Sequence, residues 1–503
     1  MAVNTFTGGT ANWGTATNWS LGTVPTATDG HVTTFDNTSP NCTVNVAAAC
    51  NNINFNGGTG WAGALTMTNG IGVYGNITLS AAAMTRTGAG ILSILAASTM
   101  IANGFQWTGP VTFNYGAATT MTFTLSDAWD ITGNILFAGT GVGPMLFSGF
   151  TLTLRANITV FTNGNRLVGG STKFIYAGTG IWISGTNSYI NNAFELNTSG
   201  TLTCNLNAGI QVYYSTSLFN FIAGTIDGTA GIMFYNCSIT CAVGCAFPNI
   251  NIVRNTTITI LSDITITTLN IGGAGSFATI INGLFNLNLS TFTITSTTNT
   301  FSGTATYVMS GTGTITGNNT STIENNLEFN SAGTITMSGA LILTSTFTIT
   351  AYGSLTLGSS TISLGATSTL TVNRNNVTLR TITIAASTTF NGTYGFTLAT
   401  LTCIVAGVTL NLKSTNTYTI TTTLTLTGTA ASHVTFLSSV GGSQAIIILL
   451  NNGTATHDVG FVTATDIDSS GGQTIWNYKG THTRTSNWNL LVANTTKALI
   501  MQV

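Results

Sequence analysis

The sequence has few charged residues. Of its 503 residues, 11 are Lys or Arg and 12 are Asp or Glu, so 5% are charged and the net charge is −1. A typical globular protein has about 25% charged residues. Binding to nucleic acid requires clustered Lys and Arg that displace counterions from phosphates, and an acidic membrane surface requires similar clusters. The composition therefore excludes both kinds of partner, and it lacks the high net charge of a disordered chain.

Helix-forming patterns are also missing. Gly contributes 58 residues, much of the remainder is Thr, Asn and Ser, and Pro contributes 5. Thr, Asn, Ser and Gly are poor helix formers, and no segment places apolar residues at a 3.6-residue spacing. Because 43% of the residues are nevertheless hydrophobic, the chain has enough apolar side chains for a core. The composition predicts an all-β structural protein and does not favour an enzyme.

The N-terminal residues Met1 to Gly9 include no basic residue and no apolar run, so we expect no secretory signal peptide. The most apolar segments, 90–102 and 445–450, are interrupted or short compared with the ~20 residues of a spanning helix. We expect a soluble chain that is made in a cytoplasm and does not insert into a membrane.

Seven cysteines are an odd number for a disulfide framework, and a chain of this size does not need disulfides to form a core. Cys237, Cys241 and Cys245 are spaced four apart, but no His lies near them and the spacing is not that of a zinc site. We expect the cysteines to be small buried residues, with no metal and no cofactor.

The dominant pattern is an alternation of one apolar residue with Thr, Ser or Asn, in runs of three to six residues. Ile258-Thr259-Ile260, Leu287-Asn288-Leu289 and Phe292-Thr293-Ile294 are examples. A period of two indicates strands with one buried and one solvated face. The β-branched residues Thr, Ile and Val suit such strands.

The spacing of the runs predicts the architecture. Successive runs begin at Phe347, Leu355, Ile362 and Leu370, which are 8, 7 and 8 residues apart. Antiparallel sandwiches have longer strand spacings and more hairpin turns. Three short strands per turn predict a right-handed parallel β-helix of about 22–24 residues per coil. One coil cannot bury its own faces, so the coils must stack into a long, capped array.

Both ends of the chain differ from its middle, because they contain more aromatic and irregular sequence. We therefore expect an N-terminal cap or attachment module at 1–60, a β-solenoid at 61–450 and a C-terminal cap at 451–503. The region around 100–250 is rich in Phe, Tyr and Trp, and we expect its coils to be wider or decorated.

The N-terminal segment resembles a known module. Its pattern is Gly8-Gly9-Thr10-Ala11-Asn12-Trp13, Asn18-Trp19-Ser20, Gly22, Val24-Pro25, Asp29 and Thr34-Phe35-Asp36, followed by Cys42-Thr43-Val44-Asn45-Val46 and Ala47-Ala48-Ala49-Cys50-Asn51-Asn52-Ile53-Asn54-Phe55. It resembles the opening module of β-helical surface proteins of bacteria and virion proteins of tailed phages. The segment Asp466-Ile467-Asp468-Ser469-Ser470-Gly471-Gly472, with Asn487-Trp488-Asn489-Leu490, resembles the closing coil of that family. About 100 residues at the two ends resemble the family in detail.

The resemblance implies a role on a surface. Bacterial members are exported behind a signal peptide, so the expected lack of one favours a structural protein of a phage virion: a fibre, spike or capsid decoration made in the host cytoplasm. Such a protein would be non-enzymatic, would assemble with other virion proteins and with copies of itself, and would adhere to host surface glycans. The alternatives are an adhesin or extracellular filament on a bacterial cell surface, and a polysaccharide depolymerase of tailspike type.

The depolymerase alternative requires two neighbouring carboxylates beside a sugar-binding groove. The acid pairs closest in sequence are Asp127 with Asp130, Glu324 with Glu328, and Asp466 with Asp468. Asp127 and Asp130 flank Trp129, and they form a candidate glycan site because an indole stacks on sugar rings. Trp107 is added to this candidate site. The competing interpretation is that these residues are turns or strand ends.

Asp466, Asp468, Ser470 and Gly471 match the first half of an oxygen-ligand calcium loop. Position twelve of that loop is Asn477 instead of Glu, so the bidentate ligand is missing. The alternative is a turn in which Asp and Ser bind their own backbone.

Assembly contacts are expected at both ends. Trp13 and Trp19 are candidates in the N-terminal module, and Leu499 and Ile500 are candidates near the C-terminus. A terminal apolar segment would dock onto a neighbouring chain.

Thr-x-Thr runs occur at 348–350, 381–383 and 423–425. A flat ladder of Thr on one solenoid face would order ice-like water. The competing interpretation is that Thr is the favoured outward residue of a β-surface. The runs do not recur at one constant interval, which favours the second interpretation.

Overall fold

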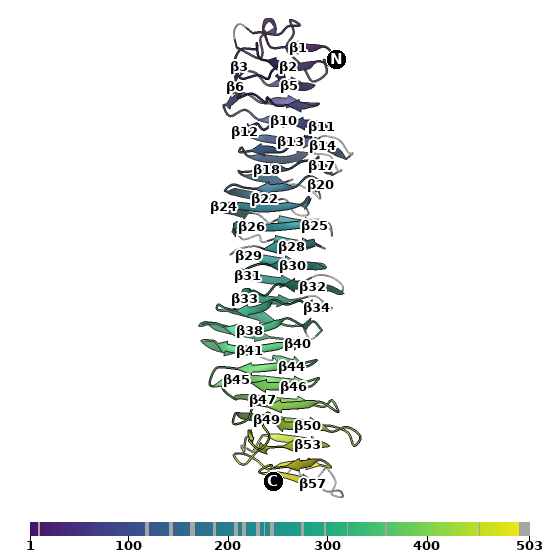
Figure 1. Ribbon diagram of the computed structural model, residues 1–503, viewed down its shortest axis with the longest axis vertical. Coiled ribbons are helices and arrows are strands. Elements are labelled where there is room, and N and C mark those ends of the chain that lie inside the picture. Colours follow the sequence, from purple (N-terminus) through teal and green to yellow (C-terminus); the bar gives the residue numbers. More distant parts are fainter. Residues whose placement is uncertain are drawn as a thin grey trace. The chain divides into compact units, whose positions relative to one another are not determined.

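The computed structural model describes residues 1–8, 11–115, 120–139, 144–160, 166–184, 188–205, 210–213, 218–227, 232–235, 237–241, 246–272, 276–295, 298–318, 320–357, 360–451 and 453–491. The chain is divided into two compact units, Met1–Ile264 and Thr265–Val503. In both units the strands pair in parallel and stack coil upon coil (Figure 1). Among the described residues the helical structure is one 3₁₀ turn, Ala16–Asn18. The predicted all-β parallel solenoid is confirmed.

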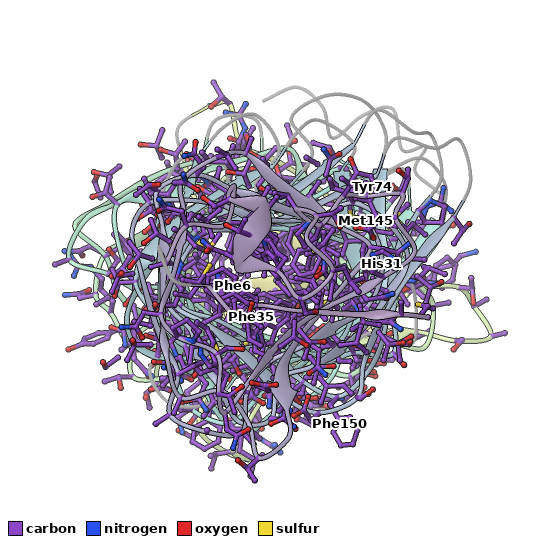
Figure 2. All side chains as sticks on the ribbon, turned by 90° about the horizontal axis from the view of Figure 1, so that it is seen from above. Phe6, His31, Phe35, Tyr74, Met145 and Phe150 are labelled. Carbon is purple, nitrogen blue, oxygen red and sulfur yellow. The ribbon has the colours of Figure 1, made fainter. Side chains whose placement is uncertain are left out.

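Aromatic rings close the N-terminal end of the first unit. Trp13 and Trp19 lie 4.9 Å apart between ring centroids, and Phe6 contacts Trp19 at 5.0 Å. Phe35 continues the cluster with a centroid 4.8 Å from that of Trp61. Seen along the stack, Phe6 and Phe35 lie in the interior (Figure 2). This cluster covers the apolar interior of the first coils.

Polar residues of the N-terminal pattern hold this cap together. The Asn18 side-chain amide donates to the carbonyl of Asn12, and the Trp19 indole donates to the carbonyl of Trp13. Asp29 accepts hydrogen bonds from the backbone N–H groups of Thr26 and His31. The residues that carry the resemblance therefore have structural roles in the cap.

Three parallel sheets enclose the core of the first unit. The first sheet contains β4 (Ala48–Cys50), β7 (Ile71–Val73), β10 (Leu92–Ile94), β13 (Val111–Tyr115), β16 (Ile135–Gly139), β19 (Ile158–Val160) and β22 (Gly180–Ser184). The second contains β1 (Val3–Thr5), β2 (Val32–Asp36), β5 (Asn52–Gly57), β8 (Ile77–Thr78), β11 (Ser98–Ile101), β14 (Met121–Leu125), β17 (Met145–Gly149), β20 (Arg166–Gly170) and β23 (Ser188–Asn191). The third contains β12 (Gln106–Trp107), β15 (Trp129–Ile131), β18 (Leu152–Leu154) and β21 (Phe174–Tyr176), and β3 (Cys42–Val44), β6 (Ala64–Met67) and β9 (Thr85–Thr87) form a separate small sheet.

Later coils of the first unit contain longer strands. β24 (Phe194–Asn205) pairs with both β21 and β22, so one strand follows two faces and the corner between them. The remaining strands described in full within this unit are β25 (Ile210–Tyr213), β26 (Leu218–Asp227), β27 (Ile232–Tyr235), β28 (Cys237–Cys241), β29 (Ala246–Ile252) and β30 (Thr256–Ile260).

The aromatic residues of the region around 100–250 stack inside the solenoid. Phe137 of β16 is fully buried between Phe113 and Phe174, with ring centroids 5.5 and 6.0 Å away and nearly parallel planes. Phe113 and Phe137 occupy equivalent inward positions of successive coils, because parallel pairing in register places neighbouring strands about 4.8 Å apart. Phe174 reaches the same stack from β21, on another face. The aromatic richness of this region belongs largely to the core.

The second unit also has three faces. The first contains β32 (Ser276–Asn282), β34 (Thr298–Ser302), β37 (Thr322–Ile323), β40 (Ala340–Leu343), β43 (Thr361–Leu364), the second halves of β45 (Val377–Ile384), β47 (Phe396–Cys403) and β49 (Thr417–Thr427), and then β52 (Thr456–Gly460), β55 (Ile475–Tyr478) and β57 (Trp488–Leu491). The second contains β33 (Asn286–Ile294), β35 (Thr306–Met309), β38 (Asn326–Asn330), β41 (Thr346–Ala351), β44 (Ser368–Val372), β46 (Thr388–Asn391), β48 (Thr409–Leu412), β50 (Val434–Ser438), β53 (Val462–Thr465) and β56 (Thr481–Thr483). The third contains β36 (Gly313–Thr316), β39 (Thr334–Ser338), β42 (Ser354–Thr356), the first halves of β45, β47 and β49, β51 (Ala445–Leu449) and β54 (Ile467–Asp468).

Coil length varies around the predicted range. Phe347 pairs with Leu370, 23 positions later, and the four runs that the sequence places between Phe347 and Leu370 become β41 to β44. Leu92 pairs with Val111, only 19 positions later. Ile420 pairs with Leu449, 29 positions later. Most of the difference lies in the corners, because most strand pairs keep one register along their length.

Cys42, Cys50 and Cys403 are buried and form no disulfide. Burial raises the pKa of the Cys42 and Cys50 thiols to about 12, so both stay protonated and behave as small apolar groups.

Candidate surface binding site

The structure corrects the expected sugar-stacking site. Trp107 and Trp129 occupy inward positions of β12 and β15, where their side chains are 1% and 2% exposed. Arg86 lies over Trp107, with its guanidinium carbon 5.6 Å from the ring centroid. Neither indole offers a face to a sugar. The expectation was wrong because Trp129 has the same strand parity as Ile131, which is also buried.

Asp127 has a structural role in a turn. Its two carboxylate oxygens accept hydrogen bonds from the backbone N–H groups of Ala102, at 2.6 Å, and Asn103, at 2.5 Å. Asn103 has a positive φ of 50°, and its side chain donates to the carbonyl of Leu79. The carboxylate therefore joins two coils at a tight turn, as the turn interpretation predicted.

Asp130 belongs to a surface ladder of polar side chains. It accepts a hydrogen bond from Gln106 at 2.8 Å and forms an ion pair with Arg155, whose Nε lies 2.8 Å from the carboxylate. The hydrogen bond to Asp130 raises the pKa of the Arg155 guanidinium. Both side chains are partly exposed, so the pair contributes at most about 1 kcal/mol of stability. The Asp130 carboxylate is therefore paired with the Arg155 guanidinium.

The calcium-like segment forms a turn with an ion pair. Both Asp466 carboxylate oxygens bind the Arg484 guanidinium, with Oδ2 2.6 Å from Nη2. Oδ2 also accepts the backbone N–H of Gly442. The hydrogen bond from Arg484 holds the pKa of Asp466 below its ordinary value. Asp468 accepts the backbone N–H of Ser470, which is the turn that the alternative interpretation predicted.

The described residues contain no group of three or more His, Cys, Asp or Glu side chains arranged to hold a metal ion. The expected calcium ligands Asp466, Asp468 and Ser470 therefore do not form such a group. Within the same ranges, no helix has the length and hydropathy that crossing a bilayer requires.

The expected assembly residues have different outcomes. Trp13 and Trp19 are 0% and 2% exposed, so these rings form the cap core and offer no surface to a neighbouring chain. That expectation was wrong for the two tryptophans, because an end of a solenoid must first cover its own interior. Leu499 and Ile500 lie outside the described residues.

The first sheet of the first unit has a shallow groove on its outer side. Its volume is about 370 Å³. Residues from five successive coils line it, namely Ile91, Pro110, Val111, Thr112, Asn134, Ile135, Leu136, Asn157, Thr159, Ile181 and Ile183. Four inter-strand spacings of about 4.8 Å give it a length of about 19 Å. None of the lining residues is charged.

Two columns of residues form the groove. Along the middle of the strands, Thr112, Leu136, Thr159 and Ile183 are paired in this order, coil by coil. At the corner before the strands, Ile91, Pro110, Asn134, Asn157 and Ile181 follow one another. In the middle column hydroxyl groups alternate with apolar side chains, and in the corner column two neighbouring Asn amides lie between apolar residues.

Three of the apolar side chains are partly open to solvent. Ile91, Leu136 and Ile181 are 43%, 37% and 36% exposed. The Asn157 side-chain oxygen accepts a hydrogen bond from the backbone N–H of Ile181 at 2.8 Å. This hydrogen bond orients the side-chain amide of Asn157. Exposed apolar groups beside oriented polar groups are typical of binding surfaces.

A sequence signal for this groove exists. Ile135-Leu136-Phe137 and Ile181-Trp182-Ile183 are consecutive apolar residues in a chain where Thr normally alternates with them. Strand parity turns Leu136 outward in the first triplet, and it turns Ile181 and Ile183 outward in the second. Consecutive apolar residues therefore identify strands with an exposed apolar position.

No family model matches this chain, and the comparisons with curated proteins and with solved structures found no match.

Proposed function

We propose that the chain is a non-enzymatic structural protein of a virion surface, of the fibre, spike or capsid-decoration type found in tailed phages. Its stacked coils present a recognition surface. The observation that carries the proposal is the uncharged groove on the first unit, where Ile91, Leu136 and Ile181 are exposed beside Asn and Thr side chains. This surface replaces the buried tryptophans as the candidate contact with host glycans.

The lining of the groove suits a saccharide. The apolar side chains face the C–H groups of a sugar, and the Asn134 and Asn157 amides and the Thr112 and Thr159 hydroxyls supply donors and acceptors. The groove is shallow and near the lower end of the 300–1,000 Å³ range of small-molecule sites. One copy would bind weakly, and many copies on one particle would bind strongly through avidity.

The partners of the acidic residues support a non-enzymatic role. Asp127 binds two backbone N–H groups, Asp130 pairs with Arg155, and Asp466 pairs with Arg484. A glycosidase needs two carboxylates free for general acid, general base or nucleophilic chemistry. These three acids instead connect coils, which is what a structural protein requires.

The class of virion protein is supported by the N-terminal pattern. Its residues build the aromatic cap, and the resemblance of that pattern covers both phage virion proteins and bacterial surface proteins. We propose the phage role, and the bacterial adhesin is the alternative. The two roles differ in where the protein is found.

Immunoelectron microscopy of virus particles and bacterial cells that contain the protein tests the proposal. Antibody label on capsids or tails is the expected result. Label on cell envelopes or free filaments would replace the virion role with the adhesin role.

Groove variants test the contact surface. We expect Leu136→Asn combined with Ile181→Asn to weaken binding of the multivalent protein to an array of bacterial surface polysaccharides. Phe150→Asn is the matched control, because Phe150 is 59% exposed and lies outside the groove lining. Unchanged binding of the double variant, or an equal loss in the control, would contradict glycan recognition at the groove.

A further inference from the structure

The second unit has a regular array of hydroxyl groups on its first face. The array consists of two columns, Thr361, Thr381, Thr400 and Thr423 in one and Ser363, Thr383, Thr402 and Thr425 in the other. Each hydroxyl residue pairs directly with the next in its column. Four successive coils therefore carry the motif Thr-x-Ser or Thr-x-Thr at one place on one sheet.

The array is regular although the sequence intervals are not. Thr381 follows Thr361 by 20 positions, Thr400 follows Thr381 by 19, and Thr423 follows Thr400 by 23. The intervals differ because the corners between the strands contain different numbers of residues. The one register shift between β47 and β49 lies between Leu398 and Thr400, outside the array, and the pairs from Thr400 to Cys403 continue without interruption.

The spacing follows from strand geometry. Neighbouring coils are about 4.8 Å apart, and two residues along a strand span about 6.7 Å. The hydroxyls thus form a lattice of about 4.8 by 6.7 Å. Buried residues, namely Ile362, Ile382, Leu401 and Leu424, lie between the two columns and fix the backbone from below.

The hydroxyls are available to solvent. All eight side chains are partly exposed, and the structure gives none of these eight described residues a side-chain hydrogen bond to another protein group. The eight positions contain no charge. Asp458, which pairs with Thr425, marks the end of the array. On the second face the comparable pairs are interrupted, because Thr348 lies next to Glu328 and Thr371 lies next to Asn391.

Such a surface orders water. Each hydroxyl offers one donor and two acceptors at a fixed position, and the Thr methyl groups restrict the orientation of the first water layer. A charged side chain would impose its own hydration shell, and none lies within the array. Water molecules held at regular spacings along two axes form an ordered layer, and a growing ice crystal extends that layer.

We propose that this threonine face binds ice. The ligand is the ordered water lattice at a crystal surface, and the site is the two-column array on β43, β45, β47 and β49. The inference is independent of the virion role, since it depends on the second unit and on no property of the groove.

Thermal hysteresis of the full-length protein tests the proposal. We expect the purified chain to lower the freezing point below the melting point and to shape ice crystals into facets. Thr383→Tyr and Thr402→Tyr each place a bulky ring in the middle of the array, and each is expected to abolish most of the hysteresis.

Thr336→Tyr is the matched control. Thr336 is an outward residue of β39 on the third face, between Thr314 and Thr356, and we expect this variant to keep full activity. Strand surfaces accept Tyr, and equal melting temperatures of the three variants would verify their folding. Rounded crystals without hysteresis for the unaltered protein would overturn the proposal, as would an equal loss in the Thr336 variant.

Discussion

Replacement of Phe137 by Ala removes the centre of an aromatic stack in the first unit. The ring is fully buried and packs against Phe113, Phe174 and the edge of Phe147, with centroids 5.5, 6.0 and 5.7 Å away. A buried Phe→Ala change costs about 3–5 kcal/mol through lost transfer energy and a cavity. Parallel coils on both sides cannot collapse into that cavity without losing register, so we expect about 4 kcal/mol or more.

The adjacent residue provides the control. Leu136 lies on the same strand with opposite parity, and its side chain is 37% exposed in the groove. We expect Leu136→Ala to change stability by about 0.5 kcal/mol or less, as is usual for surface substitutions. Two neighbouring residues of similar hydrophobicity thus differ severalfold in their effect, solely because of the face on which they lie.

Native-state hydrogen exchange is the appropriate assay. In a stack where each coil contacts only its neighbours, a weakened coil opens locally before the whole chain unfolds. We expect the amides of β13, β16, β19 and β21 to lose protection in the Phe137 variant. We expect chemical denaturation to report a smaller change in unfolding free energy than hydrogen exchange reports for these strands. Equal protection losses for Phe137→Ala and Leu136→Ala would refute the assigned strand parity and with it the groove.

Three further perturbations test other parts of the structure. Gly149→Ala should destabilise the chain by more than about 1 kcal/mol in a thermal melt, because Gly149 has a φ of 99° and an added Cβ would lie 1.9 Å from a backbone oxygen of the coil before it. Gly441→Ala, where a Cβ meets nothing within 4 Å, should change little. Arg484 holds the pKa of Asp466 below 3.8. This ion pair therefore stabilises the fold above that pH, and the stabilisation is lost as the pH falls below it. Denaturation midpoints measured from pH 6 to pH 3 should fall less steeply for Asp466→Asn than for the unaltered chain. Burial lowers the pKa of His457 below 6.5, and its Nε2 accepts the backbone N–H of Trp476. The unfolded chain therefore takes up the proton first, melting temperatures should fall as the pH drops below about 6.5, and His457→Gln should reduce that dependence.

Strand alternation made the fold predictable. The runs at Phe347, Leu355, Ile362 and Leu370 appear as successive strands, and their spacing corresponds to one coil. The N-terminal aromatic residues stood out from the repeat in the sequence, and Trp13, Trp19 and Phe35 pack against one another. Local pattern is sufficient here because every coil repeats one arrangement of inward and outward residues.

The surface sites were less predictable, for two reasons. Trp129 was expected to stack on a sugar from its residue type, although its parity with Ile131 places it inside. The threonine array was hidden because the intervals between Thr361, Thr381, Thr400 and Thr423 vary with corner length. Which hydroxyls become neighbours depends on inter-coil register, and sequence spacing alone does not specify that register.

The variable corners also make the protein an adaptable scaffold for display. Strand pairs 19 positions apart in the first unit and 29 positions apart in the second unit both keep parallel pairing, so extra residues leave the sheets in place when they enter at a corner. The turn at Gly441 and Gly442 has open space around both residues, and the neighbouring strands β50 and β51 are held by their own pairings. A foreign peptide inserted beside Gly441, which leaves the Gly442 N–H bound to Asp466, would project from the chain. The stacked sheets can therefore carry a different loop at this corner without being rebuilt.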